Sequence, residues 1–283
     1  MHTNGEEIAK VSVHGGHSGT YCFHAQDDLE EIVKEYIRQG FRWFGITEHM
    51  PPVSDQWIYS FERKFGWDAE KMKDRFFIYA DEVRYLQKKY EQYIDIYFAF
   101  ETEAYEGSFD AIAYWIDVLK PDYIVGSVHH MGGVEMDTNP STYMQCADYY
   151  GGIDELYIAY FQRQYELLSE LEPKVVGHFD LVRIFDPEYR ARIIRPNIWD
   201  SVERNLELIR DRGLILDFNL RALTKGQQEP YVCEPILERA IELGISLVPG
   251  DDSHGIGLVG NHWDKGISIL KEKGADLHWK KPI

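Results

Sequence analysis

The sequence has few of the features that mark disulfide-stabilised or nucleic-acid-binding proteins. Only three of its 283 residues are cysteines, and no two of them form a CxxC pair. An odd number of scattered cysteines fits a reduced protein and argues against a disulfide scaffold. The formal net charge is -18 and no basic tract is present. We expect no nucleic-acid partner, because binding to a phosphate backbone needs clustered positive charge.

Long apolar runs are also missing. None approaches the roughly 20 residues that a helix needs to cross a bilayer. Residues 1–10 are polar and acidic, without the basic start and apolar stretch of a secretory leader. We therefore expect a cytoplasmic protein with no membrane partner.

Several common catalytic signatures are absent too. The sequence contains no GxSxG turn of a serine hydrolase, no GxxxxGK[ST] phosphate loop, no HExxH helix and no paired CxxC motifs for structural zinc. These absences exclude the best-known nucleophilic-serine, P-loop and metallopeptidase designs. The chemistry has to come from another arrangement of residues.

Seven short apolar stretches have the length and composition of buried strands. Almost every one ends in a histidine, a carboxylate or an amide. The stretches span residues 10–16, 41–49, 93–103, 123–130, 175–180, 214–219 and 246–254. In an α/β barrel the carboxyl ends of the strands meet on one face. Polar residues that are far apart in the chain would gather there.

Helical patterns of crossover length lie between these stretches. Leu29, Ile32, Val33, Tyr36 and Ile37 form one apolar face after a capping aspartate, and further helices are predicted at about 68–91, 109–119, 153–171, 197–212 and 232–243. The alternation predicts an α/β barrel in a single domain over residues 1–283, with an open doubly wound sheet as the alternative. Segments 51–67 and 132–152 interrupt the pattern and are candidate lids or substrate walls.

Histidines and carboxylates are concentrated at the predicted strand ends. His14, His17 and His24 place three imidazoles within eleven residues. The other candidate ligands are Glu48, His49, Glu101, His129, His178, Asp252 and His254. Imidazoles and carboxylates are ligands for zinc, manganese or iron. The set exceeds what one ion needs, which predicts two to three divalent transition-metal ions.

Four residues at or beside the predicted strand ends have competing interpretations. Glu101 alone fits a buried salt bridge as well as a metal ligand. Glu48 is either a ligand or an acceptor that orients an imidazole. Cys22 lies between candidate ligands, but without a second cysteine nearby it fits a packed small residue better than a thiolate ligand. His130 follows His129, and the alternation of a continuing strand would turn it away from the site.

Seven motifs occur in order along the chain: HGGHSGxxCxHA, TEHMP, FETE, VGSVHH, VVGHFDL, DFNxRAL and GDDSHG. Together they resemble the histidinol-phosphate phosphatases of the PHP superfamily over roughly residues 11–260. The resemblance implies a distorted seven-stranded (β/α)7 TIM-like barrel, the PHP fold, with a trinuclear metal site. This agrees with the seven strands predicted from the apolar stretches.

The resemblance also implies a ligand set in which Glu101 bridges two ions. The ligands of the first ion would be His14, His17, Glu101 and Asp252. The ligands of the second would be Glu101, His129 and His178. The ligands of the third would be His24, His49 and His254.

Two positions depart from the family pattern. The first motif is usually HxH, but here His14 and His17 are separated by two glycines. Either the loop reshapes so that His14 replaces the missing ligand, or the first metal site is weakened, and the glycines favour reshaping. The family often has an arginine after the TEHxP segment, where this chain has Pro52, so that phosphate contact is lost.

Catalytic roles are predicted for Glu101, Asp180 and Asp252. Glu101 and Asp252 would hold the ions that activate water, and Asp180 would either hold His178 or donate a proton to the leaving alkoxide. The predicted substrate-binding residues are Arg183, Asn219, Arg221 and Lys225. The cations would neutralise a phosphate and the amide would hydrogen-bond the substrate; an ordinary surface charge is the alternative for each cation.

The predicted activity, implied by the resemblance, is hydrolysis of L-histidinol phosphate to L-histidinol and phosphate in histidine biosynthesis. Metal-activated hydroxide would attack the phosphorus in line, without a phosphoenzyme. The expected partner is thus a small phosphate ester. Two alternatives stand beside it: a different small phosphate ester or nucleotide as substrate, and a metal-binding barrel without catalytic activity. The sequence leaves open whether the protein is a monomer or a homo-oligomer.

Overall fold

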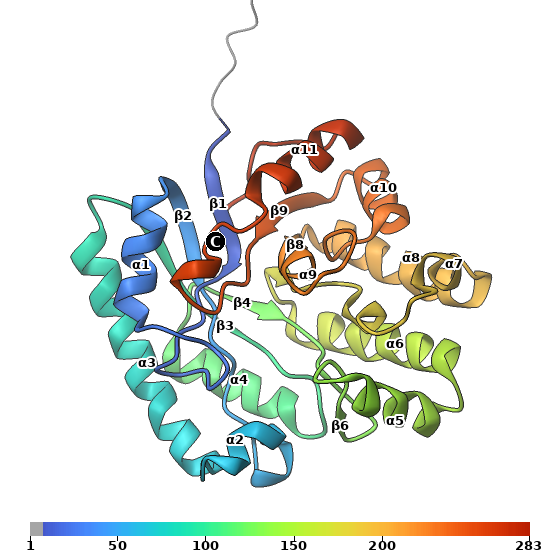
Figure 1. The fold of residues 1–283 in the computed structure, drawn as a ribbon, viewed down its shortest axis with the longest axis horizontal. Helices are drawn as coiled ribbons and strands as arrows, with labels where there is room; N and C mark the ends of the chain where they lie inside the picture. The colour runs from blue at the N-terminus through green and yellow to red at the C-terminus, as the bar shows by residue number, and fades with distance from the viewer. Residues whose placement is uncertain (1–7) are drawn as a thin grey trace, which may run out of the picture.

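The computed structural model describes residues 8–283, and its centre is a sheet of seven parallel strands (Figure 1). The strands are β1 Lys10–Gly15, β2 Phe41–Ile46, β3 Asp95–Glu101, β4 Tyr123–Gly126, β7 Val175–Val176, β8 Ile215–Asn219 and β9 Ser246–Gly250. They follow one another across the sheet in chain order. Each coincides with one of the seven predicted stretches. Residues 1–7, which belong to the polar segment 1–10, lie outside the described residues.

The first and last strands meet and nearly close the sheet into a barrel. The backbone N–H of Asp252 donates to the carbonyl of His14 at 2.8 Å, and that of His17 donates to the carbonyl of Ser253 at 2.8 Å. The predicted seven-stranded barrel is confirmed. The open doubly wound sheet is wrong, because such a sheet reverses its strand order at a switch point, whereas this one does not.

Helices cover the outside of the strands (Figure 1). The longer ones are α1 Leu29–Arg38, α3 Ala69–Tyr90, α4 Ser108–Leu119, α6 Ile153–Leu171, α8 Pro196–Arg212, α10 Glu234–Glu242 and α11 Trp263–Lys273. All but α11 match a predicted helix. In α1, Leu29, Ile32, Val33 and Tyr36 are buried at helical spacing. Within residues 8–283, no helix is both long and apolar enough to cross a membrane.

The two predicted insertions carry short elements of their own. Segment 51–67 contains a turn of 3-10 helix, Asp55–Trp57, and α2 Ser60–Lys64. Segment 132–152 contains β6 Val134–Glu135, which pairs with β5 His130–Met131, and α5 Pro140–Tyr150. The periodicity did not predict α5, nor the one-turn helices α7 Tyr189–Ile193 and α9 Arg221–Thr224. The one-turn helices have too few turns for an apolar period to show. In α5 only Tyr143, Cys146 and Ala147 are buried, so its apolar face is small.

The end of the barrel seam is held by a buried hydrogen-bond network. The hydroxyl of Tyr36 in α1 donates to Asp251 Oδ1 at 2.7 Å and accepts from the N–H of Gly16 at 3.2 Å. Ser12 Oγ in β1 donates to the same Asp251 oxygen at 2.6 Å. The network therefore joins β1, α1 and the segment after β9.

Tyr36→Phe should lower the free energy of unfolding by about 1–3 kcal/mol, because the buried Asp251 carboxylate and the Gly16 N–H each lose a partner. Urea unfolding measures the change. Tyr93→Phe is the matched control, since Tyr93 is 70% exposed and should change nothing. Equal stability of the two variants would show that the network does not stabilise the seam.

Candidate metal centre

Glu101 lies at the end of β3 and faces four histidines from four other strands or strand ends. Its Oε1 is 2.8 Å from His178 Nε2 and 3.3 Å from His129 Nε2. Its Oε2 is 3.2 Å from His49 Nδ1 and 3.5 Å from His14 Nε2. Only 1% of the residue is exposed. Each oxygen of the Glu101 carboxylate therefore faces two histidines, so the carboxylate is placed to bridge two metal ions.

The first motif reaches this site through a bulge in β1. Ser12 pairs with Phe44 and Gly15 pairs with Ile46, so β1 has one residue more than β2 between these two pairs. The extra residue lets both His14 and His17 point inward, where both are fully buried. A Cβ on Gly15 would lie 2.6 Å from a tyrosine hydroxyl, and Gly16 has a φ of +54°. The two glycines therefore allow the reshaped loop, which brings His14 to Glu101.

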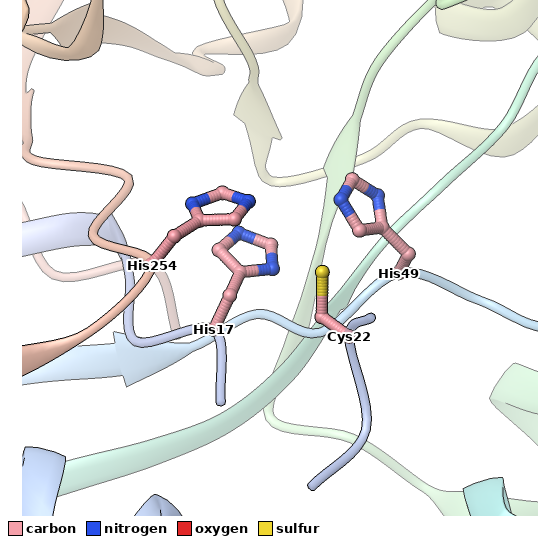
Figure 2. A group of neighbouring side chains, drawn as sticks. All are labelled: His17, Cys22, His49 and His254. Atoms are coloured by element: carbon pink, nitrogen blue, oxygen red, sulfur yellow. The ribbon is translucent and has the colours of Figure 1, made fainter. Parts of the chain in front are cut away.

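A second group of side chains lies around Asp252. His17 Nε2 and His254 Nδ1 are each 3.4 Å from Asp252 Oδ1. The rings of His17 and His254 stack with centroids 4.2 Å apart, and the His49 ring lies 4.8 Å from that of His17. Figure 2 shows these three rings converging on one space beside the sulfur of Cys22.

Four sets of donors have ligand atoms within 4.8 Å of one another. They are His14, His17 and Asp252; His14, Glu101 and His178; His49, Glu103 and His129; and His17, Cys22, His49 and His254. The structure thus brings together eight of the ten predicted metal ligands. Only His24 and Glu48 fall outside these sets.

The donor atoms are left unsatisfied by the protein itself. His14 Nε2, His49 Nδ1, His254 Nε2 and both ring nitrogens of His17 are buried without a hydrogen-bond partner among the described residues. Some of these atoms lie close to carboxylate oxygens but are not aligned for a hydrogen bond. A buried unpaired polar group costs about 1–3 kcal/mol. Cations that accept the lone pairs would remove this cost, so the residues fit divalent metal ions.

The Glu101 carboxylate stays charged. Burial raises the pKa of Glu101, but the surrounding histidines outweigh it and hold that pKa well below its usual value. Burial lowers the pKa of His14, yet Glu101 and Asp252 outweigh it and raise that pKa well above its usual value. The pKa of His129 is raised in the same way, with Glu103 and Glu101 overcoming burial. A metal ion has to displace these protons, because it binds deprotonated ligands.

His49 and His254 behave differently. Burial lowers the pKa of His49, and the effect exceeds the opposing effect of Glu101. Burial lowers the pKa of His254 well below its usual value, and the neighbouring His24 and Arg221 act in the same direction. Both imidazoles are neutral at pH 7, so their lone pairs are free for a metal.

Two carboxylates that the sequence interpretation missed lie against the predicted ligands. Asp217 Oδ2 on β8 lies 2.9 Å from His14 Nδ1, which directs His14 Nε2 towards Glu101. A hydrogen bond of this kind fixes the tautomer and orientation of a metal ligand. Glu103 Oε2 makes such a bond with His130 Nδ1 at 3.0 Å, and its Oε1 lies 3.0 Å from His129 Nδ1 without hydrogen-bond alignment. A signal existed for each: Asp217 interrupts an apolar strand, and Glu103 follows Glu101 at strand spacing.

Two of the predicted ligands lie on strained backbone. His178 has a φ of 21° and Asp252 a φ of 44°, values that residues other than glycine rarely adopt. Each such residue costs on the order of 1–3 kcal/mol. Hydrogen bonds hold them there: the Asp252 N–H donates to His14 O at 2.8 Å, and the His178 N–H to Asp217 Oδ2 at 3.3 Å. Both positions lie in stretches predicted as strand, which end earlier than predicted for this reason.

A cavity of about 310 Å³ opens above the cluster. Its floor includes Glu101 and Asp252, and its walls carry Arg221 and Lys225. It is large enough for a small phosphate ester. A wider surface groove of about 940 Å³ between segment 51–55, α3 and α4 contains none of the donor residues, so the smaller cavity is the candidate substrate site.

The structure corrects the predicted roles of Asp180 and Arg183. Asp180 Oδ2 accepts from Arg183 Nε at 2.8 Å, and its two oxygens also accept the N–H groups of Val232 and Cys233 at 2.9 Å. Arg183 is 1% exposed and donates further to the carbonyls of residues 229 and 230. Neither residue lines the cavity. The pair holds the loop after β8 in place and is not free to act on a substrate.

Asn219 is also corrected. Its Nδ2 donates to Asp217 Oδ2 at 2.9 Å and lies 3.4 Å from Asp252 Oδ2, and its Oδ1 accepts the N–H of Arg221 at 2.9 Å. These contacts use both ends of the amide. Asn219 therefore positions Asp252 and Arg221 instead of binding the substrate itself.

Glu48 and His24 lie at the edge of the cluster. Glu48 Oε1 accepts from the N–H and hydroxyl of Ser18 at 2.7 and 2.9 Å, and its Oε2 is 3.6 Å from His17 Nδ1. This geometry fits the alternative in which Glu48 orients an imidazole. His24 lines the cavity, and its ring stacks on that of His254 at 4.5 Å.

Six cavity residues were not predicted: Tyr59, Phe61, Asp137, Thr138, Leu181 and Tyr231. Tyr59 and Phe61 come from segment 51–67, and Asp137 from segment 132–152. The sequence signal for these three was the position of the segments after strand ends, which marked them as candidate substrate walls. Tyr231 carried no such signal.

The fold and site define a class: an α/β barrel that collects imidazole and carboxylate ligands at the carboxyl ends of its strands, as metal-dependent hydrolases of this architecture do. Comparison with known families identifies it further. The model of the PHP domain matches residues 15–221. The chain belongs to the PHP domain family.

Known relatives agree with this assignment. A probable histidinol-phosphatase from Schizosaccharomyces pombe is 34% identical over 268 residues, which cover 93% of this chain and 87% of the relative. The histidinol-phosphatase of Saccharomyces cerevisiae is 29% identical, covering 89% and 85%. The crystal structure of a putative histidinol phosphatase from Listeria monocytogenes superimposes with a TM-score of 0.76 at 25% identity, covering 90% and 99%.

A histidinol phosphate phosphatase from Lactococcus lactis, solved with zinc, L-histidinol and phosphate, shares the fold. Its TM-score is 0.69 at 20% identity, and the match covers 95% of both chains.

Glu101→Gln should reduce the metal content of the purified protein and lower its turnover at least about 100-fold, because the amide replaces a charged carboxylate whose two oxygens face four histidines. Elemental analysis measures the metal. Glu106→Gln is the control, since Glu106 is exposed. Full metal content and activity in Glu101→Gln would mean that Glu101 is a structural salt-bridge residue.

Proposed function

We propose that the protein is a metal-dependent phosphomonoesterase that hydrolyses L-histidinol phosphate to L-histidinol and phosphate. The main support for the proposal is that Arg221 has unpaired hydrogen-bond donors beside the metal cluster. This residue lines the cavity beside the metal cluster, and its Nε and Nη1 are buried without a partner among the described residues. A guanidinium with free donors next to a metal cluster is suited to bind a phosphate.

The relatives support the choice of substrate. Relatives that match nearly the whole chain carry the name histidinol-phosphatase, including the Saccharomyces cerevisiae protein at 29% identity. We further propose two to three bound ions of zinc, manganese or iron, held by the eight clustered residues with His24 beside them. We also propose a cytoplasmic location, which the three free cysteines support.

When bound, the ions would supply Lewis-acid stabilisation of the phosphoryl oxygens and lower the pKa of water. The chain's own residues do the rest. Arg221 pairs with phosphoryl oxygens, and Lys225 adds a second positive charge on the same wall. Asn219 holds the Arg221 backbone in place. Phe61 and Leu181 line the cavity and reduce its water content.

The other end of the substrate carries an ammonium group and an imidazole. Asp137 lines the same cavity and is its only lining carboxylate outside the four donor sets among the described residues. Asp137 shares this cavity with the aromatic residues Tyr59 and Tyr231. We assign Asp137 to the substrate ammonium, and the aromatic wall with Phe61 to the imidazole ring.

The proposal is tested by phosphate release from L-histidinol phosphate and from a panel of other phosphomonoesters and nucleotides. Protein of measured metal content is compared with chelated protein. Strong preference for L-histidinol phosphate that is lost on chelation supports the proposal. Activity confined to other esters would overturn the substrate, and no hydrolysis by fully metal-loaded protein would indicate a non-catalytic metal-binding barrel.

Arg221→Ala should lower kcat/KM for L-histidinol phosphate about 10–100-fold, mainly through KM, because a charged hydrogen-bond donor to phosphate is lost. Steady-state kinetics measure it. Arg210→Ala, in the exposed last turn of α8, is the control. Unchanged kinetics in Arg221→Ala would dismiss the phosphate-binding role.

Asp137→Asn should raise KM for L-histidinol phosphate about tenfold or more, because the ammonium loses its charged partner. The same variant should treat the analogue without the amino group as the wild type does. Asp148→Asn, an exposed change in α5, is the matched control. An equal rise in KM for both substrates would show that Asp137 stabilises the structure of the cavity wall and does not bind the ammonium group.

A further inference from the structure

Cys22 occupies an unexpected position for a lone cysteine. It lies in the loop between β1 and α1 and is 3% exposed. Figure 2 shows its sulfur pointing from this loop towards the space between the rings of His17 and His49. The sulfur belongs to the set of four donors that also contains His254. Among the described residues, the side chain within hydrogen-bond distance of the sulfur is His24, with Nδ1 at 3.3 Å.

The histidines of this set lack a complete set of partners. Both ring nitrogens of His17, both of His49 and Nε2 of His254 are buried and unpaired among the described residues. A neutral imidazole offers one lone pair. His17 occurs in two donor sets, with His14 and Asp252 in one and with Cys22 in the other. His49 likewise occurs in two sets, here and with Glu103 and His129. Because each imidazole can serve only one ion, the ion beside His49 and His254 has too few imidazoles and needs another donor.

We propose that the Cys22 thiolate is a ligand of the ion held by His49 and His254. On binding, the thiol loses its proton to water and the sulfur donates an electron pair to the ion. Ligand atoms around tetrahedral zinc are separated by roughly 3.3–3.6 Å, as follows from Zn–N and Zn–S bonds of about 2.0–2.3 Å. The atoms of the set already lie within 4.8 Å of one another, so small side-chain shifts complete the geometry.

The other cysteines show what a packed cysteine looks like in this fold. Cys146 is fully buried in the core, and its sulfur donates to the carbonyl of Met131 at 3.3 Å. Cys233 is buried beside Asp180, which accepts its N–H. Neither belongs to a donor set among the described residues. Packing alone, the interpretation favoured by the sequence, does not explain why Cys22 faces three unpaired imidazoles.

A thiolate ligand would make the metal position beside Cys22 selective for zinc. Soft sulfur ligands favour zinc, whereas imidazole and carboxylate sets also accept manganese and iron. The ion at Cys22 should therefore be zinc even where the Glu101 positions are filled by another metal. This inference rests on the metal centre of the proposed function but not on the identity of the phosphate ester.

Cobalt substitution tests the proposal without relying on activity. The wild-type protein is stripped, reloaded with cobalt and examined for the near-ultraviolet charge-transfer band of a thiolate–cobalt bond. The band should be present in the wild type and in Cys146→Ser, and absent in Cys22→Ser. Zinc affinity of one site should fall about tenfold or more in Cys22→Ser only. The wild-type zinc protein should also show a sulfur neighbour at about 2.3 Å by X-ray absorption.

The X-ray absorption measurement needs no variant, so it stands even where Cys22→Ser fails to fold. Cobalt-loaded wild type without the band, zinc-loaded wild type without a sulfur neighbour, or a band that persists in Cys22→Ser would overturn the proposal. An active, metal-loaded enzyme without sulfur coordination removes this inference alone. A wild-type protein that takes up no metal removes the proposed function as well.

Discussion

The structure depends on one buried carboxylate, Glu101, and the four imidazoles that share its oxygens. Its Oε1 and Oε2 lie 2.8 Å from His178 and 3.2 Å from His49, and the group is almost fully buried. Burying this charge is unfavourable unless opposite charge compensates it. Protons on His14 and His129 provide part of that compensation in the metal-free protein, and divalent ions would replace them. The barrel around Glu101 is the framework that holds these groups within reach of one another.

The framework can do this because the seam between β1 and β9 closes beside the site. The hydrogen bond from the Asp252 N–H to the His14 carbonyl places ligands from the two ends of the sheet next to each other. It also holds Asp252 at a positive φ. Asp217 then fixes the ring orientation of His14, and Glu103 places a carboxylate oxygen 3.0 Å from His129 Nδ1. Stability and site geometry therefore share the same contacts, and strain at the ligands is balanced by the network that closes the barrel.

Much of this could be predicted from the sequence. Strong apolar stretches located all seven strands, and the clustering of histidines at their ends located the site, because parallel strands bring their carboxyl ends together. The roles of Asp180, Arg183 and Asn219 could not be predicted. Each follows a strand end, as a ligand would, and only the tertiary structure shows that Asp180 is committed to Arg183 and to two backbone N–H groups. The position of Asp137 in the cavity could not be predicted for a related reason. Asp137 lies in a loop, and the sequence does not show how the backbone of that loop runs.

The most direct test of this account is anomalous X-ray scattering from crystals of the metal-loaded protein, recorded on both sides of the absorption edge of the bound metal. The account predicts strong peaks at the carboxyl ends of the strands, with at least one peak within bonding distance of Glu101 and of His129 or His178. Peaks found only elsewhere on the protein, or none in a protein that still hydrolyses phosphate esters, would contradict a metal centre built around Glu101.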